Sequence, residues 1–144
     1  MIVVRVDTPA KLREYYPLIE ESMPYLLKHN AGNEELIAPD IYKMVMDGAM
    51  SMAVVEHYSD PVGWGAWSIQ PESDGTKTLH CHYMYVRPGA PGISVDELVG
   101  YGQIVAEEAA VNRLQFTTNR RGWIKRLGAY GFDVKAMVLT KEVY

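Results

Sequence analysis

The sequence predicts a mixed α/β domain in which helices flank a central, mostly antiparallel sheet. Two observations predict this fold class. Short runs rich in β-branched and aromatic residues alternate with longer segments of helical character. Three of the strand-like runs follow one another across short turns, as in an antiparallel meander, and a strand–helix–strand order near the end predicts one parallel crossover. The length of 144 residues suits one domain over 1–144 with a single core.

The chain begins with a predicted strand followed by a long helix. The run "MIVVRV" is β-branched, and Thr8 behind it can cap a helix whose first residue is Pro9. This helix is predicted to extend over 9–30. Pro17 and Pro24 lie inside it, and each removes an amide donor and crowds the preceding turn. A kinked or two-piece helix is therefore expected.

The remaining elements follow from turn signals and apolar spacing. A second helix is predicted over 39–47, and Gly48 stands where a left-handed C-terminal cap belongs. The meander comes next, as "SMAVVEHY", "VGWGAWSIQ" and "TLHCHYMYV". After the loop "RPGAPGIS", the sequence predicts a helix, a strand, a short basic helix and a closing strand, over 94–112, 113–119, 120–130 and 134–143.

Composition narrows the class of protein. A hydrophobic share of 48% and a net charge of −4 are ordinary for a folded soluble domain and predict no nucleic-acid partner. Cys81 is the only cysteine, which excludes an internal disulfide and a cysteine zinc cluster and suits a reducing compartment. No apolar run is long enough for a signal peptide or a membrane span. We therefore expect a cytoplasmic protein that does not bind membranes.

The stretch "HCHYMYV" contains the residues most suited to chemistry. His80 and His82 are two positions apart on a predicted strand, so their side chains share one face, while Cys81 points to the other and is expected to be a small buried hydrophobe. Imidazole titrates near neutrality and suits a general base. Two simpler alternatives are a pair of partly buried imidazoles without a role and a metal site completed by His57.

The order of motifs resembles the GNAT superfamily, the acyl-CoA-dependent N-acetyltransferases, over essentially the whole chain. The resemblance rests on three antiparallel strands that lead to Val-x-Pro, a glycine loop, a helix, a strand ending at Asn119, and the segment "WIKRLGAYGF". It implies a GNAT-like fold in which two strands splay apart and acetyl-CoA, the co-substrate, lies in the gap. The pyrophosphate is then held by loop amides at the helix N-terminus.

The resemblance also implies roles for individual residues. The placement of His80 and His82 is similar to the histidine pair of the arylalkylamine N-acetyltransferases, which implies that one of them accepts the proton of the attacking amine. The implied cofactor-binding residues lie beside the pantetheine arm, in the pyrophosphate turn, after the next strand and on the basic helix: Met84, Tyr85, Val86, Gly89, Ala90, Gly92, Ile93, Ser94, Asn119 and Lys125. The basic segment 113–132 that contains the last of these is either a solvated face or a phosphate contact.

Several positions depart from the family pattern. The loop is about two residues shorter than in the family, and Pro91 removes one amide donor. Family members carry a tyrosine on the last short helix that protonates the departing thiolate, whereas Ile124 or Leu127 stands there in this chain. Tyr130 is nearby and is the remaining candidate for that role. In these departures the chain resembles the GNAT-like proteins of tailed phages, which implies a catalytically degenerate module that binds host or virion protein.

Two functions are thus expected from different classes. The first is acetyl transfer from acetyl-CoA to a primary amine of a small molecule, peptide or protein. The second is the phage-type interaction module, located in the host cytoplasm or the virion. An enzyme should keep an open cleft between "TLHCHYMYV" and "RLQFTT", whereas an interaction module should fill it with side chains such as Trp123 or Tyr83. A homodimer is expected through the exposed final strand.

Overall fold

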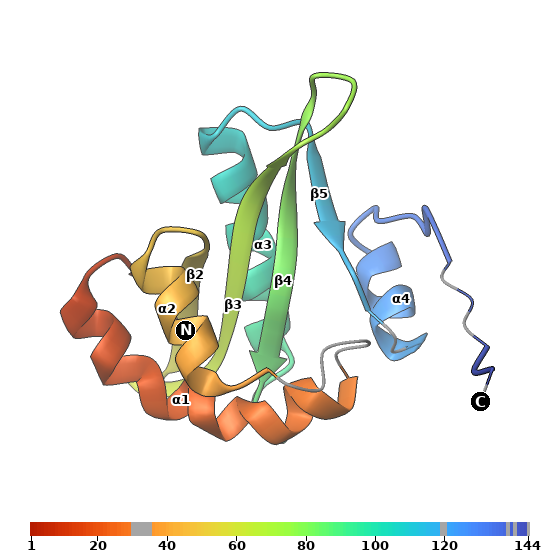
Figure 1. The fold of residues 1–144 in the computed structure, drawn as a ribbon. Helices are drawn as coiled ribbons and strands as arrows, with labels where there is room; N and C mark the ends of the chain where they lie inside the picture. The colour runs from red at the N-terminus through yellow and green to blue at the C-terminus, as the bar shows by residue number, and fades with distance from the viewer. Residues whose placement is uncertain (30–35, 119–120, 138, 140, 144) are drawn as a thin grey trace.

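The central element is a five-stranded mixed sheet (Figure 1). The computed structural model describes residues 1–29, 36–118, 121–137, 139 and 141–143. The strands stand side by side in the order in which they occur in the chain. Their bounds are Ile2–Val6 for β1, Ser51–His57 for β2, Asp60–Pro71 for β3, Lys77–Val86 for β4 and Arg113–Phe116 for β5.

The pairing of the strands confirms the predicted fold class. Neighbouring strands from β1 to β4 pair antiparallel, and β5 returns parallel to β4. Helix α3 (Ile93–Glu108) makes the crossover between β4 and β5, as expected for a parallel pair. The other helices are α1 (Pro9–His29), α2 (Ala38–Met46) and α4 (Arg121–Gly128). Within the described residues, no helix is both long and apolar enough to cross a membrane.

Helices cover both faces of the sheet and bury a separate apolar cluster on each. Helices α1 and α2 pack with Trp64 on one face, where Ile19 and Ile41 are fully buried. Helix α3 packs on the other face, where Leu98 and Trp67 are fully buried. Each large side chain removed from water contributes about 1.5–3 kcal/mol, so these two clusters supply most of the driving force for folding.

The expected break of the first helix into two pieces is wrong. Helix α1 runs without interruption through Pro17 and Pro24. An interior proline costs roughly 3 kcal/mol. Along its length the helix buries apolar side chains that include Leu12, Leu18 and Leu26, and the burial of this stripe outweighs the cost of the two prolines.

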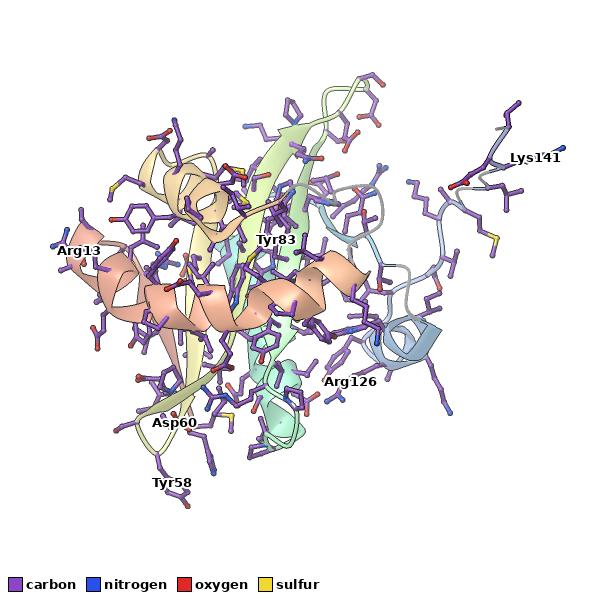
Figure 2. The ribbon with its side chains drawn as sticks, turned by 60° about the horizontal axis from the view of Figure 1, so that its bottom comes forward. Arg13, Tyr58, Asp60, Tyr83, Arg126 and Lys141 are labelled. Atoms are coloured by element: carbon purple, nitrogen blue, oxygen red, sulfur yellow. The ribbon has the colours of Figure 1, made fainter. Side chains whose placement is uncertain are left out.

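The closing strand predicted over 134–143 is also wrong for the residues that the structure describes. They form no strand there, and Val134, Met137 and Leu139 are exposed. Lys141 stands away from the sheet (Figure 2). Strand propensity becomes a strand only where amides pair with a neighbouring strand, and the described residues of this tail have no such neighbour. The described tail therefore does not provide the strand through which a homodimer was expected.

Two irregularities of β4 shape the region that follows. Ala66 pairs with Tyr83 and Trp67 pairs with Cys81, so His82 is the extra residue of a β-bulge. The pairing of β4 with β5 ends at Cys81 and Phe116, whereas β4 continues to Val86. Residues 82–86 therefore have no partner in β5, and the splayed strand pair implied by the resemblance is present.

Candidate active site

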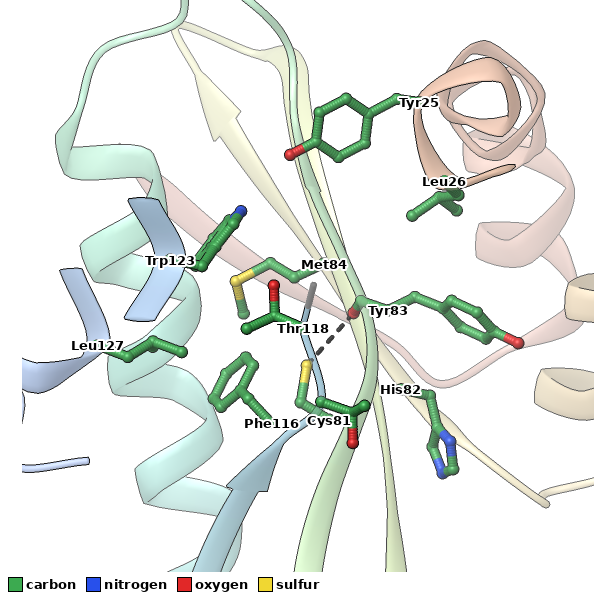
Figure 3. Close-up of a pocket in the computed structure, with 11 residues that line it drawn as sticks. Tyr25, Leu26, Cys81, His82, Tyr83, Met84, Phe116, Thr118, Trp123 and Leu127 are labelled. Carbon is green, nitrogen blue, oxygen red and sulfur yellow. Dashed lines mark hydrogen bonds between the residues drawn. The ribbon is translucent and has the colours of Figure 1, made fainter. Parts of the chain in front are cut away.

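A pocket occupies the gap where β4 and β5 part (Figure 3). It leaves about 60 Å³ of free space. Clefts that enclose a whole drug-sized ligand hold roughly 300–1,000 Å³, so this space suits only a small functional group. Its walls come from α1, β4, β5 with the residues after it, and α4: Tyr25, Leu26, Cys81, His82, Tyr83, Met84, Phe116, Thr117, Thr118, Trp123 and Leu127.

The pocket connects the two faces of the sheet. On the side of α1, its wall includes Tyr25 and His82. On the side of α3 and α4, it includes Met84, Trp123 and Leu127. The bulge at His82 inserts one extra residue into β4. Around it, side chains of β4 pack with the apolar cluster under α1 and α2 and with the cluster under α3. Two molecules, one bound on each face of the sheet, could therefore contact each other in the gap.

The two histidines lie on one face of β4, as predicted. Their ring centroids are 4.7 Å apart. A ring nitrogen of His82, Nε2, lies 2.6 Å from the Ser68 hydroxyl oxygen on β3. His80 interacts with the side chain of Gln115 on β5, and its buried Nδ1 has no hydrogen-bond partner among the described residues. Ser68, the two histidines and Gln115 together form a polar row across β3, β4 and β5. His82 is the member of this row that lines the gap.

The surroundings favour the neutral form of both imidazoles. Burial lowers the pKa of His80 below the usual 6.5, and a weaker opposing contribution comes from Gln115. Burial also lowers the pKa of His82, and the neighbouring His80 lowers it further. At neutral pH each ring therefore keeps a lone pair, which is the state that a general base requires.

Cys81 lines the gap but has the properties of an inert side chain. It is 2% exposed, and burial strongly raises the pKa of its thiol. Its Sγ donates a hydrogen bond to the Tyr83 carbonyl at 3.4 Å. A protonated, buried thiol is a poor nucleophile. No three histidine, cysteine or carboxylate side chains within the described ranges are grouped so that they could hold a metal ion.

The loop between β4 and α3 contains three of the five residues assigned to the pyrophosphate turn, and Ile93 and Ser94 begin α3. Gly89 has a φ of 84°, a backbone conformation that suits glycine. The amides of Ala90 and Ser94 are used inside the loop, where they donate to the carbonyls of Arg87 at 3.0 Å and Pro91 at 2.9 Å. Within the described part of the chain, the amides of Gly89 and Gly92 make no such turn bond. Only part of the loop therefore offers donors to a ligand.

Two arginines flank this loop in different ways. Arg87 at its start is neutralised by Glu21 of α1, through two contacts of 2.9 Å, and by Asp60 at 3.2 Å. Arg126 reaches the loop from α4 (Figure 2) and donates to the Gly92 carbonyl at 2.7 Å. It also lies 3.6 Å from a carboxylate oxygen of Asp96. The side chain of Arg126 therefore contacts the loop and is still partly exposed to solvent.

The other predicted residues are spread around this centre. Met84 lines the gap. Val86 packs with the cluster under α3, and Tyr85 is buried and donates to Glu21 at 3.0 Å. Burial raises the pKa of Tyr85 to about 12. Three further residues lie away from the gap or outside the described residues: Ile93 at the exposed start of α3, Lys125 exposed on α4, and Asn119, which is not described.

The candidate proton donor near the end of the chain lies outside the gap. Tyr130 is 41% exposed and does not line the gap. Leu127, one of the two residues that match the family tyrosine in sequence, is buried and does line it. No phenol therefore enters the gap from α4.

Sequence reasoning missed several residues of the site. Tyr25 of α1 carried no motif, because its position depends on how the helix lies across the sheet. Ser68 lies in a strand of the meander whose other residues are mostly apolar, and no motif marks it as a site residue. Arg126 was part of the recognised basic segment, and that signal could have singled it out. Trp123 was weighed only as a packing residue or a filler of the gap.

Comparisons with known proteins show the fold. No protein-family model matches the sequence, and no curated protein matches it. Among solved structures, a probable acetyltransferase superposes with a TM-score of 0.76 at 14% identity and covers 100% of both chains. AAC(6′)-Iy, solved with a CoA-containing bisubstrate analogue, has a TM-score of 0.74 at 12% identity over 99% of this chain and 97% of its own.

A third solved structure agrees with the first two. The ribosomal-protein-alanine N-acetyltransferase of Brucella melitensis biovar Abortus 2308 has a TM-score of 0.71 at 14% identity. The match covers 100% of this chain and 99% of that one. These similarities show that the chain has the fold of the GNAT acetyltransferases over its whole length.

Proposed function

We propose that this chain, which has the GNAT acetyltransferase fold, transfers the acetyl group of acetyl-CoA to a primary amine of a small molecule, peptide or protein. The observation that carries the proposal is the gap between β4 and β5 with two neutral imidazoles at its mouth. An ammonium group has no lone pair, so the acceptor must lose a proton before it attacks. His82, which lines the gap, is positioned to accept that proton, and His80 stands beside it.

The unpaired edge of β4 supports a position for the cofactor. Residues 82–86 have no partner in β5, so backbone groups on this edge are available to the amides of the pantetheine arm and to the thioester carbonyl. We assign Met84, Tyr85 and Val86 to that contact. Amides alternate along a strand and that of Tyr85 faces β3, so the amide of Val86 is the one assigned to polarise the carbonyl. The pyrophosphate is assigned to the loop 89–94, with Asn119 and Lys125 as outer contacts.

The proposal has a direct test by calorimetry. Purified protein should bind acetyl-CoA, and adenosine 3′-phosphate 5′-diphosphate, which keeps the pyrophosphate but lacks the pantetheine arm, should bind more weakly. The difference reports the contacts along β4. No detectable heat at millimolar acetyl-CoA would overturn the enzymatic function.

Arg126 is expected to contribute to this binding. Arg126→Ala should raise the Kd for acetyl-CoA about threefold to tenfold, because a partly exposed cation beside the loop is lost. Lys125→Ala removes the neighbouring charge on α4 and should have a smaller effect. The same titrations at two salt concentrations check the result, since the contribution of Arg126 should shrink as salt increases. An equal loss in the two variants would indicate only a general effect of charge.

A second candidate function is the interaction module without acetyl transfer. Two features favour it. Trp123 and Tyr83 both stand on the walls of a narrow gap, and Leu127 occupies a position where the family carries a proton donor. Absence of acetyl-CoA binding in the calorimeter would favour this second function. For either function, the free buried thiol of Cys81 supports a reducing location such as the cytoplasm.

A further inference from the structure

Acetyl transfer needs a second proton step, at the sulfur atom. The amine nitrogen forms a bond to the carbonyl carbon, and the carbon–sulfur bond then breaks with its electron pair on sulfur. A proton donor close to the sulfur makes this departure easier. Helix α4 does not provide one, because Leu127 lines the gap and Tyr130 lies outside it.

The side chains that line the gap leave few choices for the donor. The Cys81 thiol already donates to a carbonyl, and burial raises its pKa. The hydroxyl of Tyr83 points away from the gap in Figure 3, and burial, followed by the charge of Asp40, raises its pKa. Threonine hydroxyls at 117 and 118 are much weaker acids than a phenol, whose pKa is about 10.

Tyr25 is the phenol on the wall of the gap whose hydroxyl turns toward the cofactor side. It extends from α1 to the gap, and Figure 3 shows its hydroxyl turned toward the side where Trp123 and Met84 lie. The cofactor is proposed to enter on that side, because the loop between β4 and α3 and helix α4 both lie there. We infer that Tyr25 is the general acid that protonates the departing CoA thiolate; the inference rests on the proposed acetyl transfer.

Contacts one helical turn away hold Tyr25 in place. Its ring packs edge-on against Tyr85 with centroids 5.4 Å apart. Glu21, four residues earlier on the same face of α1, accepts hydrogen bonds from Tyr85 at 3.0 Å and from Arg87 at 2.9 Å. This network ties α1 to the end of β4. The phenol is therefore presented by a fixed part of the fold rather than by a loop.

The complete step balances with these groups. His82 accepts the proton that the amine nitrogen loses, the acetyl group moves to nitrogen, and sulfur leaves with the electron pair. The Tyr25 hydroxyl gives its proton to sulfur, which yields the CoA thiol. Nitrogen gives up two protons in all, the first when the ammonium becomes the amine and the second after the attack, and His82 passes each of them to solvent. Solvent returns one proton to the tyrosinate, so each cycle liberates one proton overall.

The first experiment needs no acceptor. CoA itself is bound to the protein, and its thiol is titrated by the ultraviolet absorbance of the thiolate. A phenol that donates to the thiolate lowers the pKa of the bound thiol. In Tyr25→Phe, which keeps the ring and its packing, about tenfold less thiolate should form at a given pH. Tyr16→Phe is the matched control, because Tyr16 lies on the same helix and packs against Tyr42 of α2.

The second experiment measures turnover of acetyl-CoA with a panel of primary amines, namely phenethylamine, glucosamine, spermidine and a lysine peptide. Tyr25→Phe should lower kcat/KM by about 10²–10⁴-fold and remove the high-pH limb of the rate profile. Incorporation of 3-fluorotyrosine at position 25, a more acidic phenol of nearly the same shape, should move that limb to lower pH. If Tyr25 has only a packing role, neither the pH of the high-pH limb nor the pKa of the bound thiol should change.

The outcomes separate the inference from the proposed function. If the unmodified protein binds no CoA, or binds it and acetylates no amine of the panel, the proposed function and this assignment both fail. If the unmodified protein is active and the thiol pKa and high-pH limb are the same in Tyr25→Phe and Tyr16→Phe, the assignment to Tyr25 alone is overturned.

Discussion

Replacing His82 by glutamine should lower kcat/KM for acetyl transfer by about 10²–10⁴-fold, the usual contribution of a general base. Glutamine keeps a hydrogen-bonding side chain near Ser68 but cannot accept the proton of the amine. The affinity for acetyl-CoA should change little, because the imidazole points away from Trp123 and Met84, the side on which the cofactor is proposed to enter. Initial rates and calorimetry on the same samples check both statements.

The pH dependence of the rate provides a further test of the same residue. Burial and the neighbouring His80 lower the pKa of His82, so the unprotonated base is present down to a pH below the usual 6.5. In the unmodified protein, kcat/KM should rise with pH along an acidic limb whose midpoint lies below that value. The acidic limb should be absent in His82→Gln.

His57 provides a matched control for the effect of replacing any histidine of the sheet by glutamine. His57 on β2 stacks against Tyr58, with centroids 4.4 Å apart, and does not line the gap. His57→Gln should retain the activity and the acidic limb of the unmodified protein. Equal losses in His57→Gln and His82→Gln would contradict a specific role for His82. If His80→Gln removes the limb and His82→Gln does not, the base is His80.

The largest expected effect on stability comes from Gly102 of helix α3. A Cβ at Gly102 would lie 2.9 Å from the Trp67 ring nitrogen. That ring cannot withdraw toward β3, because it already lies against Gly65, where a Cβ would be 2.5 Å from a ring carbon. Gly102→Ala should therefore lower the free energy of unfolding by about 1–3 kcal/mol, as overpacked cores do.

Gly100 is the matched control on the same helix. It is exposed, and a Cβ there would meet nothing within 4 Å. Gly100→Ala should raise the free energy of unfolding by about 0.5–1 kcal/mol, because alanine is the better helix former. Urea denaturation measures both variants. Stabilisation by both substitutions would show that the space beside Trp67 is larger than the structure indicates.

Local patterns were sufficient to predict most of the sheet and the face of the histidines. The period of two along "HCHYMYV" places His80 and His82 together with no tertiary information, and their rings are 4.7 Å apart. Short turns between the strand-like runs predicted the meander, and it is present. Gly48, predicted as a left-handed cap, has a φ of 76°. Such features depend on neighbours within a few residues.

Local patterns failed where burial or pairing over long distances decides the outcome. Pro17 and Pro24 predicted a break, yet the apolar stripe of α1 lies along the sheet and the helix continues. The tail over 134–143 has the composition of a strand, but the described residues pair with no neighbour. For α1, tertiary contacts worth several kcal/mol exceed the local cost of the prolines, whereas for the described tail residues no tertiary contact supports a local preference of at most about 1 kcal/mol.

The sequence by itself therefore determined the class of the fold, the meander and the paired imidazoles on β4, because each is encoded by residues close together in the chain. The tertiary structure alone decided which side chains meet in the gap. The bulge at His82, the end of pairing at Cys81 and Phe116, and the approach of Tyr25 and Arg126 from distant helices depend on how separate elements pack. No pattern within one segment contains that information, since each of these contacts joins residues far apart in the chain.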